Sequence, residues 1–76
     1  MYFILGFYKF KKIRNVKKNK NLMHSFFISK RIRGSLIISN EGINGTISAK
    51  KKILDIAINK IKRTFSFSNF DIFLNL

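Results

Sequence analysis

The sequence predicts an α+β domain in which two helices cover one face of a four-stranded antiparallel sheet. Three observations lead to this fold class. Two segments repeat apolar residues at the i, i+1, i+4, i+5 spacing of an amphipathic helix. Four others are short and either rich in aromatic and aliphatic residues or alternating with period two. A glycine- and asparagine-rich turn signal joins the two middle strand segments into a hairpin.

The first expected strand covers residues 2–10, and a polar, basic connection follows over residues 11–21. Both faces of this strand are apolar: one carries Tyr2, Ile4, Tyr8 and Phe10, and the other carries Phe3, Leu5 and Phe7. A two-layer domain buries only one face of its sheet. The second face is therefore expected to be covered by a neighbouring domain, a dimer partner or stacked nucleobases. We interpret the aromatic stretches as core residues in preference to base-stacking platforms.

The first helix is expected to begin at Leu22 and to end before Gly34. Lys30, Arg31 and Arg33 fall in its last turn, where cations stabilise the negative end of the helix dipole. Gly34 can supply the positive φ of the helix exit. The apolar face of this helix comprises Leu22, Met23, Phe26 and Phe27, bordered by Ile28 and Ile32.

A hairpin is expected next, with a buried strand over residues 35–39 and an extended segment over residues 46–48. Residues 40–45 between them contain two glycines and two asparagines, which is typical of a tight loop. Glu41 in this loop is the only acid among the first 54 residues. We expect it to attract a neighbouring cation.

The second helix is expected after Ser48, a plausible N-cap. Its apolar face comprises Ile53, Leu54, Ala57, Ile58 and Ile61. Residues 50–52 are lysines in its first turn, where each cation opposes the dipole by about 0.3–1 kcal/mol. Beyond it, aromatic residues are expected to cover the end of the core, namely Phe65, Phe67 and Phe70.

A last, half-buried strand is predicted over residues 70–76, where Phe70, Ile72, Leu74 and Leu76 alternate with Asp71, Phe73 and Asn75. The element order is thus strand, helix, strand, strand, helix, strand. This βαββαβ series is the ferredoxin-like arrangement.

Composition limits the function classes. With 76 residues we expect a single domain over residues 1–76. The absence of cysteine excludes a disulfide scaffold, a thiol nucleophile, a thiolate zinc site and an iron–sulfur cluster in this chain. One histidine and three acids leave few acid–base pairs, so we expect no cofactor, no metal and no self-contained catalysis. His24 has no acid nearby in sequence and is interpreted as a packing or surface residue.

The net charge of +13, from 16 basic and three acidic residues, has two interpretations. It indicates a polyanionic partner such as RNA, or a codon bias toward lysine, isoleucine, phenylalanine and asparagine. Lysine outnumbers arginine 12 to 4, which suits the second interpretation, since arginine is the better bidentate phosphate ligand. The candidate nucleic-acid-binding residues are Lys11, Lys12, Lys17, Lys18, Lys20, Arg31, Arg33, Lys50, Lys51 and Lys52.

No segment has the pattern of a secretory signal or a membrane span, so a cytoplasmic protein without a membrane partner is expected. Two families that share the βαββαβ order are disfavoured. Acylphosphatase chemistry needs a backbone cradle and an arginine in the first strand–helix loop and an asparagine on the second strand. Here that loop has Arg14 but no glycine, and Asn40 lies only at the strand's end. RNA-recognition motifs place aromatic residues after a Lys/Arg-Gly pair, and none follows Arg33-Gly34 before Asn40.

The segment 40–48, Asn-Glu-Gly-Ile-Asn-Gly-Thr-Ile-Ser, preceded by Gly34 and an aliphatic strand, resembles the N-terminal domain of the bacterial, rhodanese-related tRNA uridine hydroxylases. Residues 8–10 and 63–70 also resemble that family, and the resemblance covers nearly all of the chain. Its first helix differs, because the family usually has acids and small residues there. The residues that carry the family motif are Glu41, Gly42, Ile43, Asn44, Gly45 and Thr46.

The resemblance implies a part of an enzyme that hydroxylates a wobble uridine of tRNA in an oxygen-dependent reaction. In that family a ferredoxin-like domain precedes a rhodanese domain, whose loop cysteine is needed for activity. This chain has no cysteine and matches the tRNA-handling or scaffolding half. It is then expected to be a truncated or split gene product, a remnant, or a subunit completed in trans by a rhodanese domain.

The leading hypothesis is a non-catalytic module that binds tRNA, mainly by electrostatic attraction. The alternative is a protein-interaction module that docks through its apolar sheet face without binding RNA. A cationic membrane-surface peptide is disfavoured, because both expected helices have the span of core helices in a globular fold.

Overall fold

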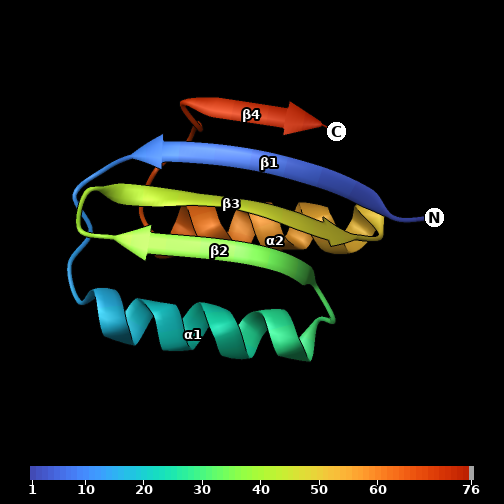
Figure 1. Cartoon of the computed structure of the whole chain (residues 1–76), viewed down its shortest axis with the longest axis horizontal. Coiled ribbons are helices and arrows are strands. Elements are labelled where there is room, and N and C mark those ends of the chain that lie inside the picture. The colour runs from blue at the N-terminus through green and yellow to red at the C-terminus, as the bar shows by residue number, and fades with distance from the viewer. Residues whose placement is uncertain (76) are drawn as a thin grey trace.

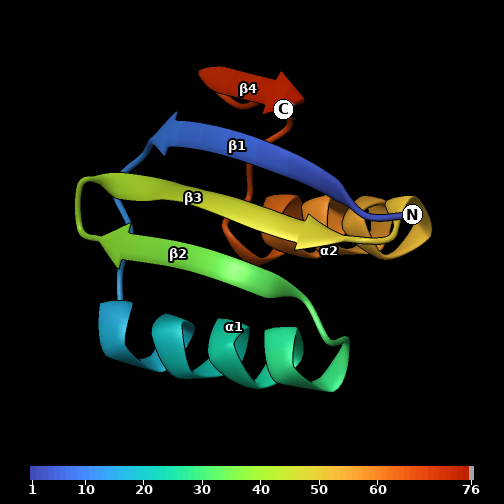
Figure 2. The same ribbon diagram turned by 45° about the vertical axis from the view of Figure 1, so that its right-hand side comes forward.

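The structure, a computed structural model, describes residues 1–75 and confirms the predicted α+β class (Figure 1). Its elements are β1 (Phe3–Phe10), α1 (Val16–Ser29), β2 (Arg33–Ser39), β3 (Gly42–Ala49), α2 (Lys51–Thr64) and β4 (Ile72–Asn75). The strands form one sheet in the order β2-β3-β1-β4, and every neighbouring pair is antiparallel. Figure 2 shows β2 and β4 at opposite edges of this sheet. The order and directions are those of a ferredoxin-like fold.

The core lies between the helices and one face of the sheet. Alternate residues of the central strands point into it, including Phe7 of β1 and Ile43 and Ile47 of β3. Met23 of α1 and Ile61 of α2 meet them from the other layer, and each is less than 2% exposed. Burying an aliphatic or aromatic side chain of this size contributes about 1.5–3 kcal/mol. This single apolar cluster holds both helices against the sheet.

The first helix begins six residues earlier than the sequence predicted, at Val16 instead of Leu22, and it ends at Ser29. Residues 17–21 are polar and had been interpreted as a connection. Val16 and Met23 are seven residues apart, so they lie on the same face and together pack toward the core. Val16 is the only apolar residue in the first turns of α1. The start of the helix was therefore not predicted from closely spaced apolar residues.

The predicted exit of this helix is also wrong. Lys30 and Arg31 follow the helix instead of forming its last turn, and Arg31 adopts the positive φ of 56°. Arg33 and Gly34 already belong to β2. Gly34 has a φ of 122° there, and a Cβ atom at this position would collide with the carbonyl oxygen of Thr46 in β3. Glycine is required at position 34 by the pairing of β2 with β3, and not by the end of the helix.

The β2–β3 hairpin is tighter than predicted. Only Asn40 and Glu41 form the turn, and β3 begins at Gly42, so residues 42–46 lie in the strand and not in a loop. Ser48 is likewise in β3. The N-cap of α2 is Lys50, which is extended and makes no side-chain cap. The predicted Ser48 cap is therefore wrong.

The C-terminal segment covers the end of the core, as predicted. Phe65 is buried, and the ring centroid of Phe70 lies 5.1 Å from that of Phe7 and 5.0 Å from that of Phe67. The predicted half-buried strand is wrong in two respects. Phe70 precedes β4, and all four residues of β4 are exposed. The predicted position of Leu76 lies outside the described residues.

No helix within residues 1–75 is both long and apolar enough to cross a membrane.

Candidate nucleic-acid interface

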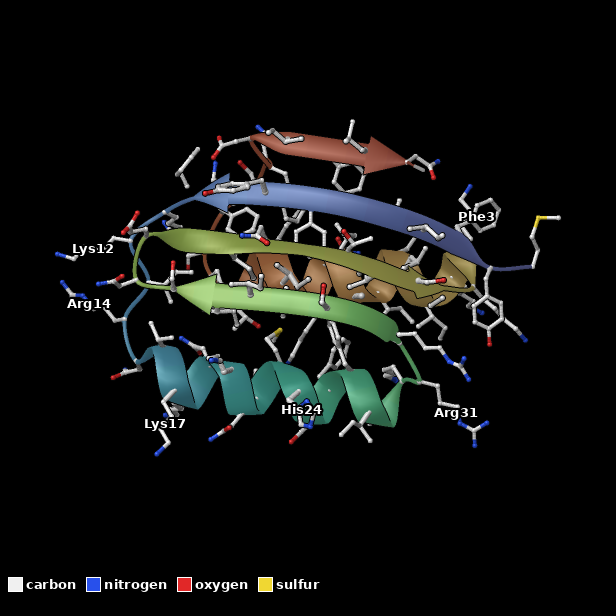
Figure 3. The ribbon with its side chains drawn as sticks, viewed as in Figure 1. Phe3, Lys12, Arg14, Lys17, His24 and Arg31 are labelled. Atoms are coloured by element: carbon white, nitrogen blue, oxygen red, sulfur yellow. The ribbon has the colours of Figure 1, made fainter. Side chains whose placement is uncertain are left out.

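The topology separates the candidate RNA-binding cations into two groups at opposite ends of the molecule (Figure 3). We call the first the β1–α1 basic end; it comprises Lys11, Lys12, Arg14, Lys17, Lys18 and Lys20. We call the second the α2 basic end; it comprises Lys30, Arg31, Arg33, Lys50, Lys51 and Lys52. The 14 residues of α1 span about 21 Å between the two ends. The predicted set therefore does not form one patch.

The β1–α1 basic end is anchored to the β2–β3 turn by backbone hydrogen bonds. The N–H of Lys11 donates to the carbonyl of Glu41 at 3.1 Å, and the N–H of Ile13 donates to the carbonyl of Asn40 at 3.2 Å. Ile13 is buried, and the Asn19 side chain donates to the carbonyl of Arg14 at 2.8 Å. The basic side chains thus project from a connection whose backbone is held in place.

A hollow of about 230 Å³ separates this connection from the end of α2. Lys11, Lys12 and Arg14 line it together with the hydroxyl-bearing residues Thr64 and Ser66. Lysine, arginine and hydroxyl groups are the side chains that most often contact phosphate oxygens. Sequence reasoning did not place Arg14 among the candidate binding residues, because only the fold brings it to this hollow.

Few of the cations are neutralised. Within residues 1–75 the structure contains one ion pair, between Lys9 Nζ and Asp71 Oδ1 at 3.6 Å. Asp71 Oδ2 also accepts the N–H of Phe10 at 2.6 Å. The cation expected beside the Glu41 carboxylate is not found among the described residues; the side chain is exposed, and the backbone carbonyl accepts the N–H of Lys11. Both basic ends therefore keep their charge available for a polyanion.

The family-motif string divides into an inward half and an outward half. Ile43 is 1% exposed in the core. A Cβ atom at Gly45 would lie 2.6 Å from the Ser35 carbonyl oxygen, and one at Gly42 would collide with the Lys9 carbonyl oxygen. These three residues are explained by packing and close strand approach.

The outward half comprises Glu41 in the turn and Asn44 and Thr46 on β3. We call the side of the sheet that faces away from the helices the open face. Asn44 and Thr46 belong to it, because they alternate with the core residues of β3. The predicted second apolar face of the sheet is present but mixed; its exposed apolar members are Ile4, Phe10, Ile37, Ile72 and Leu74.

Comparison with known proteins identifies the family. Residues 2–75 match the model described as "UPF0176 acylphosphatase like domain". The chain belongs to this family. Its βαββαβ sheet agrees with that description, and the resemblance inferred from the segment 40–48 is confirmed.

Similar curated proteins carry the name tRNA uridine(34) hydroxylase. The protein of Pelagibacter ubique is 51% identical over 71 residues, which cover 93% of this chain and 24% of that protein. The protein of Buchnera aphidicola is 40% identical over 72 residues, covering 95% and 23%. The protein of Teredinibacter turnerae is 27% identical over 62 residues, covering 82% and 19%. The chain thus spans about a quarter of the length of these relatives.

The titratable groups of this UPF0176 domain are dispersed. His24 is exposed on α1, between the two basic ends, in agreement with its interpretation as a packing or surface residue (Figure 3). Among residues 1–75 no three His, Cys, Asp or Glu side chains approach closely enough to hold a metal ion. The concentrated chemical feature of the domain is therefore its basic surface.

Proposed function

We propose that this chain is the N-terminal, tRNA-binding domain of a tRNA uridine(34) hydroxylase and that it contributes RNA binding without catalytic groups of its own. The family membership and the name of the relatives support the enzyme assignment. The lack of cysteine and the presence of only one histidine and three acids support the non-catalytic role. The β1–α1 basic end supplies the binding surface.

One observation carries this proposal. The β1–α1 basic end combines six cations, a hollow lined by three of them, and an anchored backbone. A helix N-terminus lies at each basic end, that of α1 here and that of α2 at the other, so the helix dipole does not distinguish them. The α2 basic end has the same number of cations in our definition, which makes it a charge-matched control.

The first test is the salt dependence of tRNA binding, measured by fluorescence anisotropy between about 50 and 200 mM salt. The logarithm of the association constant should fall linearly with the logarithm of salt, by about 0.7–0.9 per phosphate contacted. Six contacts give a slope of about 4–5. No binding at the lowest salt, or a flat dependence, contradicts the proposal.

The second test compares two variants, each with six Lys/Arg→Gln substitutions, one at each basic end. Both variants lose the same net charge, so their loss of long-range attraction is equal. We expect the β1–α1 variant to lose most of the slope and the α2 variant to keep most of it. Equal losses, or a larger loss at the α2 basic end, contradict the placement of the site.

A second candidate function is supported by the exposed apolar residues of the open face. The curated relatives are about four times as long as this chain, and in a protein of that length a neighbouring segment can cover the open face. If this face is a docking surface for protein, the chain should self-associate when isolated. Light scattering across a concentration series distinguishes this function, because a monomer at all concentrations argues against it.

A further inference from the structure

Two aromatic rings, that of the half-buried Tyr8 and that of the exposed Phe10, lie on the open face beside the β1–α1 basic end. Tyr8 and Phe10 are two residues apart on β1, and their ring centroids are 4.5 Å apart. Phe10 is 64% exposed and lies opposite Gly42, which presents no side chain to cover it. Lys11 and Lys12 follow directly in the chain. The aromatic pair is therefore continuous with the basic surface.

Polar side chains adjoin these rings on the neighbouring strands. Asn44 of β3 is directly opposite Tyr8, and Thr46 is opposite both Gly6 of β1 and Ser35 of β2. Gly6 of β1 has no side chain to fill the space between Thr46 of β3 and Leu74 of β4, and a hollow of about 420 Å³ opens on this face. Its lining includes Tyr8 and all of these polar residues.

The polar groups of this hollow are not committed to other partners. None of the side-chain hydrogen bonds formed within residues 1–75 involves Asn44, Thr46 or Ser35. Asn44 therefore offers both amide donors and a carbonyl acceptor, and the two hydroxyls each offer one donor and an acceptor. This set matches the edge of a nucleobase, which also presents both donors and acceptors.

The charge of the open face indicates which kind of molecule can bind there. The described residues that project from the strands onto the open face include no carboxylate, and Arg33 is the cation among them. A second copy of this chain would bring another +13 to the same place, which opposes self-association. A polyanion that also carries flat aromatic groups satisfies the charge, the rings and the hydrogen-bonding groups together.

We propose that the open face binds an unpaired nucleobase of a single-stranded RNA segment. The base stacks on the Tyr8–Phe10 pair, its edge bonds to Asn44 with Ser35 or Thr46, and the adjoining phosphates lie on Lys11 and Lys12. This inference deepens the proposed tRNA-binding function and rests on it. Single strands are recognised in this way because their bases are free to leave the helical stack.

Tyrosine fluorescence tests the stacking directly. The chain has two tyrosines and no tryptophan, so Tyr2→Phe leaves Tyr8 as the only fluorophore of its kind. We expect an oligouridylate of about eight nucleotides to quench its emission on binding, and inorganic polyphosphate, which has no bases, to bind without quenching. Saturation with oligouridylate without quenching overturns the proposal, as does equal quenching by polyphosphate.

Affinity measurements on variants locate the site. Stacking on an aromatic side chain corresponds to about a 5- to 150-fold effect on affinity per base, so Phe10→Ala should weaken oligouridylate binding by at least about 5-fold. Phe10→Leu, which keeps an apolar group in place, should show a similar loss and guards against misfolding. Asn44→Ala should cost about 2- to 10-fold.

The matched control is Tyr2→Ala, which removes an exposed aromatic residue just before the other end of β1 and should leave the affinity unchanged. Binding of a fully duplex RNA should be unaffected by all of these variants. If Phe10→Ala and Phe10→Leu leave oligouridylate binding intact while the six-residue β1–α1 variant abolishes it, the open-face inference fails and the proposed function stands. Concentration-dependent self-association through this face also overturns it.

Discussion

Gly45 belongs to the inward half of the family-motif string, and its replacement tests whether that half serves packing. A Cβ atom there would lie 2.6 Å from the Ser35 carbonyl oxygen, 3.0 Å from Phe7 Cζ and 3.1 Å from Leu36 Cδ1. Favourable contacts between carbon atoms need about 3.5–4.0 Å. All three neighbours must therefore move, and the first belongs to the backbone of β2.

The magnitude follows from two opposing terms. Overpacking of this kind costs about 1–3 kcal/mol. Alanine recovers about 0.5–1 kcal/mol, because glycine in a strand loses more conformational entropy on folding. The two ranges leave a net loss of about 0–2.5 kcal/mol, and because the shortest contact is with backbone we expect about 1–2 kcal/mol for Gly45→Ala. In a domain of 60–100 residues this corresponds to a decrease in Tm of about 4–16 °C.

The assay is thermal unfolding of the isolated domain, followed by far-UV circular dichroism. Asn44→Ala is the matched control, since its side chain is on the open face and surface substitutions usually change stability by less than about 0.5 kcal/mol. If Gly45→Ala is as stable as the wild type, or if Asn44→Ala is the more damaging change, the division of the motif into inward and outward halves is wrong.

Two further predictions concern stability. Ile47 is fully buried in the core, so Ile47→Ala should lower the free energy of unfolding in urea by about 2–5 kcal/mol, and a loss below 1 kcal/mol would contradict its central position. Asp71→Ala removes both the acceptor for the Phe10 N–H and the partner of Lys9, whereas Asp71→Asn keeps an acceptor, so the alanine variant should be the less stable by about 1 kcal/mol. Equal losses in the two Asp71 variants would assign the stabilisation to the charge pair.

The fold was predictable because each element carries its own local signal. The apolar spacing of residues 53–61 and the aliphatic run before Asn40 determine a helix and a strand without tertiary information. The start of α1 was missed for the opposite reason. Its first turns are polar, and the contact of Val16 with the core becomes visible only when the sheet is in place.

Glycine positions were the least predictable feature. Gly34 and Gly42 were assigned to a helix exit and a loop, yet both lie in strands. What requires glycine there is the approach of a backbone carbonyl from a neighbouring strand. Such a requirement depends on strand register, which local sequence patterns do not specify.

Composition indicated the cations as candidate RNA-binding residues, but it did not show how they are arranged. The topology divides them between two ends of the molecule. Ser35 and Asn44 gave no signal of a shared surface, because their proximity results from the pairing of β2, β3 and β1. Polar residues on strands are common, and only register shows which of them adjoin the Tyr8–Phe10 pair.

The most direct test of the account is a titration of the ¹⁵N-labelled domain with an RNA stem-loop whose loop contains unpaired uridines, monitored by two-dimensional NMR. We predict that the largest shift changes occur at the β1–α1 basic end and at Tyr8, Phe10 and Asn44, with little change at Arg31 and residues 50–52. Changes centred on the α2 basic end, or spread evenly over all lysines, would contradict the proposed binding surface.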